Sequence, residues 1–136
     1  MTGTTPLPLP DEDTAFFWEA CARGELHILR CRDCRTWIHY PRAICRACGG
    51  SDLAPEPVSG RGVVHTFTVT HREAPGKVAP FVVALIELEE QAGLRMVSNV
   101  IGIEPGDVAI GMPVEVMFEP AGEHVTLPLF GPRSGA

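Results

Sequence analysis

Apolar and polar residues alternate along the second half of the chain. From Gly60 onward, short runs with a period of two are separated by Gly and Pro, which is the pattern of half-buried β-strands. We predict five strands, whose apolar faces are Val63–Val69, Val82–Leu88, Leu94–Val100, Val114–Phe118 and Val125–Leu129. No helical periodicity of any length interrupts them. This spacing favours a small closed or partly closed barrel of the oligonucleotide/oligosaccharide-binding (OB) type.

One predicted strand is apolar on both faces. Phe81, Val83 and Leu85 stand opposite the face that begins with Val82, and only glutamates at the strand's end are polar. A strand with two apolar faces needs burial on both sides, so its outer face must meet the rest of the chain or a partner protein. Phe81, Val83 and Leu85 are therefore candidates for a partner interface.

The N-terminal part predicts an extended arm and one short helix. Residues 1–12 are rich in Pro and Thr, as is typical of an arm. Asp11 or Asp13 is placed to cap a helix that runs to about Arg23 and ends at Gly24. A helix this short needs a docking partner, either the domain's own core or a ligand or partner surface. Its apolar stripe comprises Phe16, Phe17, Ala20 and Cys21, with Trp18 beside it.

Two Cys-x-x-Cys pairs carry the strongest chemical signal. Cys31 and Cys34 form the first pair, Cys45 and Cys48 the second, and ten residues separate the pairs. Two facing turns of this kind supply four sulfurs at the corners of a tetrahedron around Zn²⁺. Short strands over 26–30 and 37–40 complete a predicted zinc ribbon. Four thiolates close the coordination sphere, so the zinc is predicted to be structural.

Other uses of these cysteines explain the pattern less well. Cysteines two apart are poorly placed for unstrained disulfides, and no secretion signal is visible at the N-terminus. One metal explains two matched pairs more simply than redox chemistry does, although iron fits a site of the same shape. We interpret His39 as an exposed or packed side chain, and Cys21 as a small buried residue.

Charge and composition argue against general nucleic-acid binding and against a membrane span. The net charge of −6, from 11 basic and 17 acidic residues, argues against general binding to the phosphate backbone of nucleic acids. Five arginines cluster within residues 30–48, where they partly compensate four thiolates. No apolar stretch approaches the roughly twenty residues of a membrane span, so we expect a soluble, cytoplasmic protein.

The sequence nominates no catalytic residue. The five histidines are dispersed, and Glu87 and Glu89 are interpreted as solvated charge at a strand end. A single-stranded nucleic-acid-binding module is the alternative for a ribbon joined to an OB barrel. It needs a basic groove and exposed aromatics, whereas this barrel is acidic and most of its phenylalanines are assigned to the core.

A set of motifs occurs in a fixed order along the chain. They are Phe16-Phe17-Trp18, Gly24-Glu25-Leu26, the two cysteine pairs, Tyr40-Pro41-Arg42, Ser59-Gly60-Arg61-Gly62, Val64-x-Thr66-Phe67-Thr68 and Gly111-Met112-Pro113-Val114. Over about residues 11–132 this set resembles the zinc-ribbon plus OB-fold family of acyl-CoA-associated proteins, DUF35. Arg35 departs from the family, whose members often carry Gly after the first cysteine pair.

The resemblance implies a non-catalytic accessory subunit. Its partner would be a thiolase-fold or lipid-transfer-protein-like enzyme, in some members with a hydratase-like (hot-dog) domain, and the OB-fold protein would help form the CoA channel. The narrower resemblance is to the partner of a thiolase-like aldolase in steroid side-chain degradation, which cleaves a steroid acyl-CoA by a retro-aldol reaction. This resemblance is compatible both with a separate subunit and with one piece of a longer polypeptide. Arg30, Arg42 and Arg46 are candidates for contacts with CoA phosphates.

These inferences combine into one expected fold class. It is mostly β, with an N-terminal arm and helix over 1–24, a four-cysteine zinc ribbon over 25–58 and a five-stranded OB-type barrel over 59–132.

Overall fold

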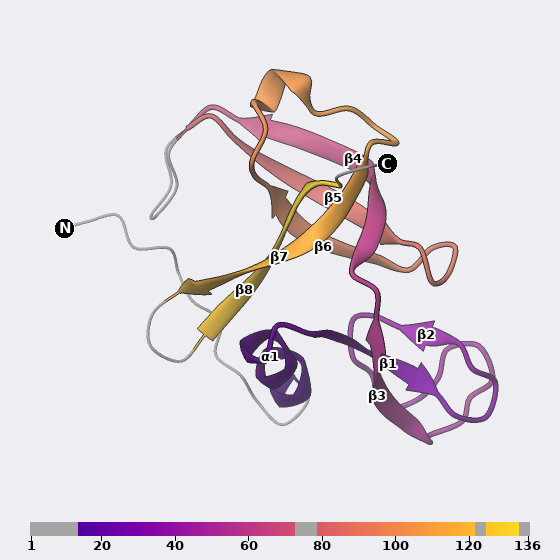
Figure 1. Cartoon of the computed structure of the whole chain (residues 1–136). Coiled ribbons are helices and arrows are strands. Elements are labelled where there is room, and N and C mark those ends of the chain that lie inside the picture. The colour runs from indigo at the N-terminus through magenta and orange to yellow at the C-terminus, as the bar shows by residue number, and fades with distance from the viewer. Residues whose placement is uncertain (1–13, 73–78, 122–124, 134–136) are drawn as a thin grey trace.

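The computed structural model describes residues 14–72, 79–121 and 125–133, and it confirms the expected fold class (Figure 1). A three-stranded sheet lies beside a closed five-stranded barrel. None of the described helices is long and apolar enough to cross a membrane. The elements are α1 (Ala15–Ala22), β1 (Leu26–Cys31), β2 (Trp37–Ile38), β3 (Leu53–Val58), β4 (Arg61–Thr70), β5 (Phe81–Leu88), β6 (Arg95–Val100), the 3₁₀ helix η1 (Pro105–Asp107), β7 (Pro113–Ala121) and β8 (Val125–Pro132).

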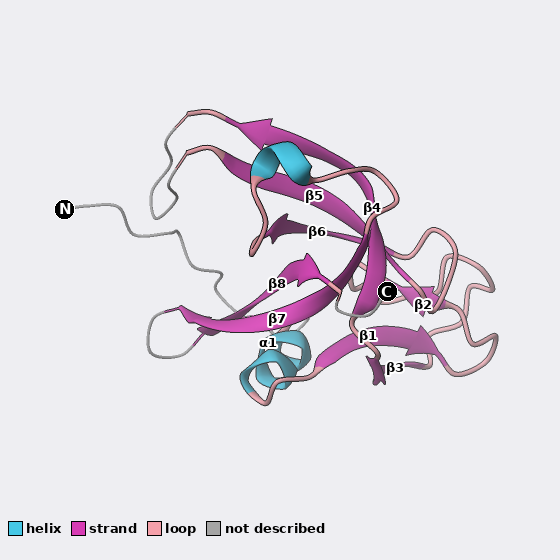
Figure 2. Cartoon of the chain, turned by 45° about the horizontal axis from the view of Figure 1, so that its top comes forward, coloured by secondary structure: helices cyan, strands magenta, loops and turns pink. Residues whose placement is uncertain are grey.

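Helix α1 docks on the domain's own core. Phe17, Ala20 and Cys21 are buried, and the helix packs mainly on β1 and β8 (Figure 2). The predicted aspartate cap is wrong, because Thr14 holds the N-cap position; Asp11 and Asp13 lie outside the described residues. The predicted stop is confirmed: Gly24 adopts a φ of 78°, and its N–H donates to the Cys21 carbonyl at 3.0 Å.

The small sheet has the order β2–β1–β3, and the sequence reading missed β3. Its sequence, LAPEPV, contains two prolines that argue against a central strand. Pro55 and Pro57 are two residues apart, so both ring nitrogens face the same side of the strand. An edge strand tolerates this, since only its other side bonds to β1.

The barrel has the strand order β4–β5–β6–β8–β7, and its closure is uneven. Strands β4 and β5 pair from Gly62–Leu88 to Thr70–Phe81. In contrast, Val100–Phe130 is the one backbone ladder pair between β6 and β8 among the described residues, and the Ile101 N–H donates to the Phe130 carbonyl at 2.8 Å. Further along, the Ser98 side chain joins β6 to the Pro128 carbonyl of β8.

Two predicted strand faces need correction. On β4 a bulge between Val64 and Thr66 shifts the alternation, so Val64 is buried while Val63 is exposed. On β8 the residue in the barrel core is Phe130, which is 0% exposed, rather than the face of Leu127 and Leu129. The reason is that β8 has two covered faces, one toward the barrel interior and one toward α1.

Side-chain hydrogen bonds join the small sheet to the barrel. Gln91, in the β5–β6 turn, accepts the Trp37 N–H at 2.9 Å and donates to the Trp37 carbonyl at 3.1 Å. The Tyr40 hydroxyl accepts the Val97 N–H at 3.2 Å. The loop after β2 is thereby fixed against the barrel wall.

Candidate functional site

Two turns of the same shape hold the four cysteines. Cys31 ends β1, and the Arg35 N–H closes the first turn on the Cys31 carbonyl at 2.9 Å. In the second turn the Gly49 N–H donates to the Cys45 carbonyl at 2.8 Å. The residue after each cysteine pair has a left-handed backbone conformation. Arg35 has a φ of 68° and Gly49 a φ of 78°. Gly adopts this conformation without steric cost, whereas Arg does not.

The four sulfurs have the spacing that a tetrahedral metal site requires. Cys31 Sγ lies 3.6 Å from Cys48 Sγ, and Cys34 Sγ lies 3.6 Å from Cys45 Sγ. All four sulfurs lie within 4.8 Å of one another. Zn–S bonds of about 2.3 Å set tetrahedral sulfurs about 3.8 Å apart. A disulfide requires about 2.05 Å, so the alternative of two disulfides is wrong.

Backbone and side-chain groups around the sulfurs favour thiolates. The Ala47 N–H donates to Cys45 Sγ at 3.3 Å, and the Gly50 N–H donates to Cys48 Sγ at 3.4 Å. Thr36 lowers the pKa of Cys34 to about 6 through its hydroxyl and backbone. The Gly50 hydrogen bond also lowers the pKa of Cys48, but the neighbouring sulfurs outweigh it and raise that pKa to about 12. Four crowded sulfurs need a cation to ionise together.

This donor set describes a structural zinc site. Four sulfurs complete a tetrahedron and leave no open position for substrate. His39 is not a member of the cluster: it stacks on Phe17, with ring centroids 5.8 Å apart. Cys21 is buried in the core, where desolvation raises the pKa of its thiol to about 12. Both interpretations of these residues as packed side chains are confirmed.

The arginines around the ribbon divide into two groups. The Arg30 guanidinium lies 4.4 Å above the Trp37 ring and contacts Glu56 at 3.4 Å. It therefore already has interaction partners within the domain. Arg42 and Arg46 are exposed, and no ion pair involves either of them within the part of the chain that the structure describes.

The outer face of β5 is apolar and half-buried. Phe81, Val83 and Leu85 point away from the barrel interior and belong to neither hydrophobic core cluster of the described residues. Leu85 pairs with Val97 on β6, which is 55% exposed. The face therefore continues from β5 onto β6.

The described residues bring together no catalytic constellation. A hydrogen bond from Arg95 holds the pKa of Glu87 below its usual range, and the Ser59 hydroxyl, followed by Arg61, lowers that of Glu89. Glu89 is exposed and Glu87 is half-buried, and both carboxylates are ion-paired. Phe67, Phe118 and Phe130 belong to the core or pack against it, so they are not free to stack on bases.

Comparison with known proteins agrees with this geometry. Residues 18–54 match the family model described as the ChsH2 rubredoxin-like zinc ribbon domain, and residues 55–119 match the ChsH2 C-terminal OB-fold domain. A solved structure described as the Ltp2-ChsH2(DUF35) aldolase is 39% identical, with a TM-score of 0.85, and the match covers 93% of this chain and 98% of that one. The chain belongs to the DUF35 family.

Relatives of this DUF35 chain carry two kinds of name. A probable enoyl-CoA hydratase alpha subunit of Thermomonospora curvata is 40% identical over 93% of this chain. A 3-oxo-4,17-pregnadiene-20-carboxyl-CoA hydratase alpha subunit of Mycobacterium tuberculosis is 40% identical over 82%. A DUF35 domain-containing scaffold protein of Methanocaldococcus jannaschii is 42% identical over 66% of this chain and 64% of its own length. The chain spans only 40% and 35% of the two hydratase subunits.

Proposed function

We propose that this DUF35 chain is a non-catalytic accessory subunit that binds and stabilises a thiolase-fold enzyme acting on acyl-CoA. The closed sulfur site and the absence of a catalytic constellation among the described residues support a scaffold. The relative named as a scaffold and the solved aldolase complex support a partner that carries the chemistry. That complex and the steroid-CoA hydratase relative favour a steroid-CoA retro-aldolase as the partner.

The outer face of β5 is the observation that carries this proposal. Phe81, Val83 and Leu85 present apolar side chains that neither core cluster absorbs, and Val97 extends the face onto β6. A contiguous apolar face on a monomer is typical of a protein interface. The partner docks here, while the zinc ribbon keeps the neighbouring loop rigid.

Arg42 and Arg46 supply the contacts with CoA phosphates in this proposal. Neither has an ion-pair partner among the residues that the structure describes, whereas Arg30 contacts Trp37 and Glu56. Guanidinium groups suit phosphate because they donate in a fixed fork. A hydratase-like hot-dog domain is a further partner, since the hydratase relatives are much longer than this chain.

The test is copurification followed by reconstitution. The tagged chain is purified from the organism that produces it, bound proteins are identified by mass spectrometry, and a thiolase-fold protein among them is expressed with and without this chain. We expect it to be insoluble or poorly active alone and to recover on coexpression. A partner that is equally soluble and active alone refutes the proposal.

Matched variants locate the interface. Leu85→Glu puts a charge on the proposed face, and Ile110→Glu makes the same change at a residue that is 69% exposed in the loop after η1. We expect Leu85→Glu to abolish copurification and Ile110→Glu to preserve it. Zinc content of both proteins shows that each is folded.

A further inference from the structure

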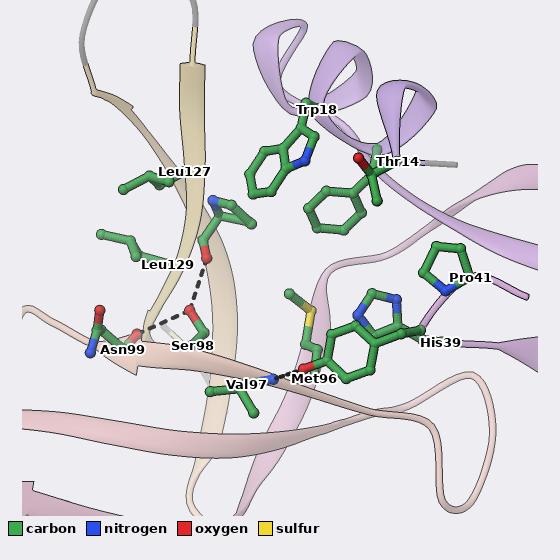
Figure 3. Close-up of a pocket in the computed structure, with 13 residues that line it drawn as sticks. Thr14, Trp18, His39, Pro41, Met96, Val97, Ser98, Asn99, Leu127 and Leu129 are labelled. Carbon is green, nitrogen blue, oxygen red and sulfur yellow. Dashed lines mark hydrogen bonds between the residues drawn. The ribbon is translucent and has the colours of Figure 1, made fainter. Parts of the chain in front are cut away.

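A pocket of about 320 Å³ opens beside the stretch of β6 and β8 that shares no backbone ladder pair. Four separate parts of the chain line it: the start of α1, the loop after β2, strand β6 and strand β8 (Figure 3). Its volume is at the lower end of the range for small-molecule sites, about 300–1,000 Å³. The pocket shares Val97 with the proposed docking face, but none of Phe81, Val83, Leu85 or the four cysteines lines it.

The two sides of the pocket differ in chemistry. One side is aromatic, with Phe17 and Trp18 at a centroid distance of 4.9 Å and His39 and Tyr40 at 4.1 Å. The other side is aliphatic. Leu127 and Leu129 come from β8, while Val97 comes from β6. Flat apolar ring systems gain contact area between such walls and lose little conformational entropy on binding.

None of the described residues that line the pocket has a charged side chain. The residue there that titrates near neutrality is His39, and desolvation lowers its pKa to about 4, so its ring is neutral at pH 7. A charged ligand would lose its hydration without gaining an opposite charge. The occupant that complements this lining is neutral.

The Tyr40 hydroxyl is a polar group of the lining that can bond to a ligand. The Tyr40 hydroxyl accepts the Val97 N–H, and no acceptor for its own proton occurs among residues 14–72, 79–121 and 125–133. By contrast, the Ser98 hydroxyl already donates to the Pro128 carbonyl at 2.8 Å. A ligand oxygen near Tyr40 would receive a hydrogen bond there.

We propose that this pocket binds a neutral, ring-fused apolar molecule with a carbonyl oxygen that accepts a hydrogen bond from Tyr40. The choice of a steroid as the example of this class rests on the proposed function. Binding would be a property of this chain alone, separate from its contact with a partner.

The test is equilibrium dialysis of the complete zinc-loaded chain against labelled progesterone, a neutral ring-fused ketone. We expect saturable binding of one molecule per chain. Val97→Glu places a carboxylate at the pocket wall and should weaken binding by about tenfold or more. The matched control Ile110→Glu lies outside the pocket and should bind like the unaltered chain. Tyr40→Phe, which removes only the hydroxyl, should weaken binding by about fivefold to tenfold.

Three results would overturn the inference. The first is the absence of saturable binding. The second is equal binding by Val97→Glu, and the third is equal binding of dodecanol, a neutral linear molecule. If progesterone never binds and Leu127→Glu, which alters the pocket but not the proposed docking face, abolishes partner copurification, the pocket is a binding site for the partner polypeptide. The pocket inference then fails while the proposed function stands.

Discussion

Gln91 determines how firmly the zinc ribbon is held against the barrel. Its side chain replaces a neighbouring strand at the outer edge of β2, because it bonds to both the N–H and the carbonyl of Trp37. Truncation in Gln91→Ala leaves both backbone groups without these partners. Each loss costs about 1–3 kcal/mol when the group is buried. The site is part-buried, so water replaces some of the lost hydrogen bonding. We therefore expect Gln91→Ala to lower the free energy of unfolding by about 2 kcal/mol in total.

A second substitution separates the two bonds. Gln91→Glu keeps an oxygen to accept the Trp37 N–H but loses the donor to the Trp37 carbonyl. We therefore expect Gln91→Glu to lower the free energy of unfolding by an intermediate amount, about 1 kcal/mol. Glu104→Ala, at an exposed position whose side chain makes no capping bond, should change stability by less than about 0.5 kcal/mol.

Urea denaturation of the zinc-loaded proteins, followed by tryptophan fluorescence, measures these losses. The expected order of stability is the unaltered chain, then Gln91→Glu, then Gln91→Ala. A Gln91→Ala protein as stable as the unaltered chain would show that the two bonds add nothing to folding. Equal losses in the two variants would show that the donor bond to the Trp37 carbonyl carries the whole effect.

Three further predictions concern the ribbon and the pocket wall. Cys34→Ala should abolish the one zinc per chain seen by mass spectrometry under native conditions, while Cys21→Ala keeps it, because only Cys34 belongs to the sulfur cluster. Arg35→Gly should have a free energy of unfolding in urea about 1 kcal/mol higher than that of Arg35→Ala. Both variants lose the contact with Glu56, but only Gly adopts the φ of 68° without strain. Equal free energies of unfolding would contradict this reasoning. Burial lowers the pKa of His39 from 6.5 to about 4, so the unfolded chain takes up a proton first as pH falls. Stability should then fall by about 1 kcal/mol per pH unit from pH 6.5 toward pH 5, and His39→Phe should flatten this slope.

Local sequence patterns were sufficient for the elements whose chemistry is local. The spacing of Cys31, Cys34, Cys45 and Cys48 predicted the four-sulfur site, because a Cys-x-x-Cys turn builds half of it without help from the rest of the fold. The alternation along β5 and β6 likewise predicted which residues enter the barrel.

Tertiary structure decided everything that depends on which elements become neighbours. The prolines of β3 are acceptable only because that strand is an edge, and Leu127 faces a pocket rather than the barrel because α1 covers β8. The joint between Trp37 and Gln91 spans 54 residues of sequence, so no local pattern encodes it. The sequence by itself determined the metal ligands and the strand periodicity, since both arise within a few residues. Only the folded chain could place the aromatic side chains of the helix and ribbon opposite the aliphatic ones of the barrel, because contacts between distant segments form only through packing.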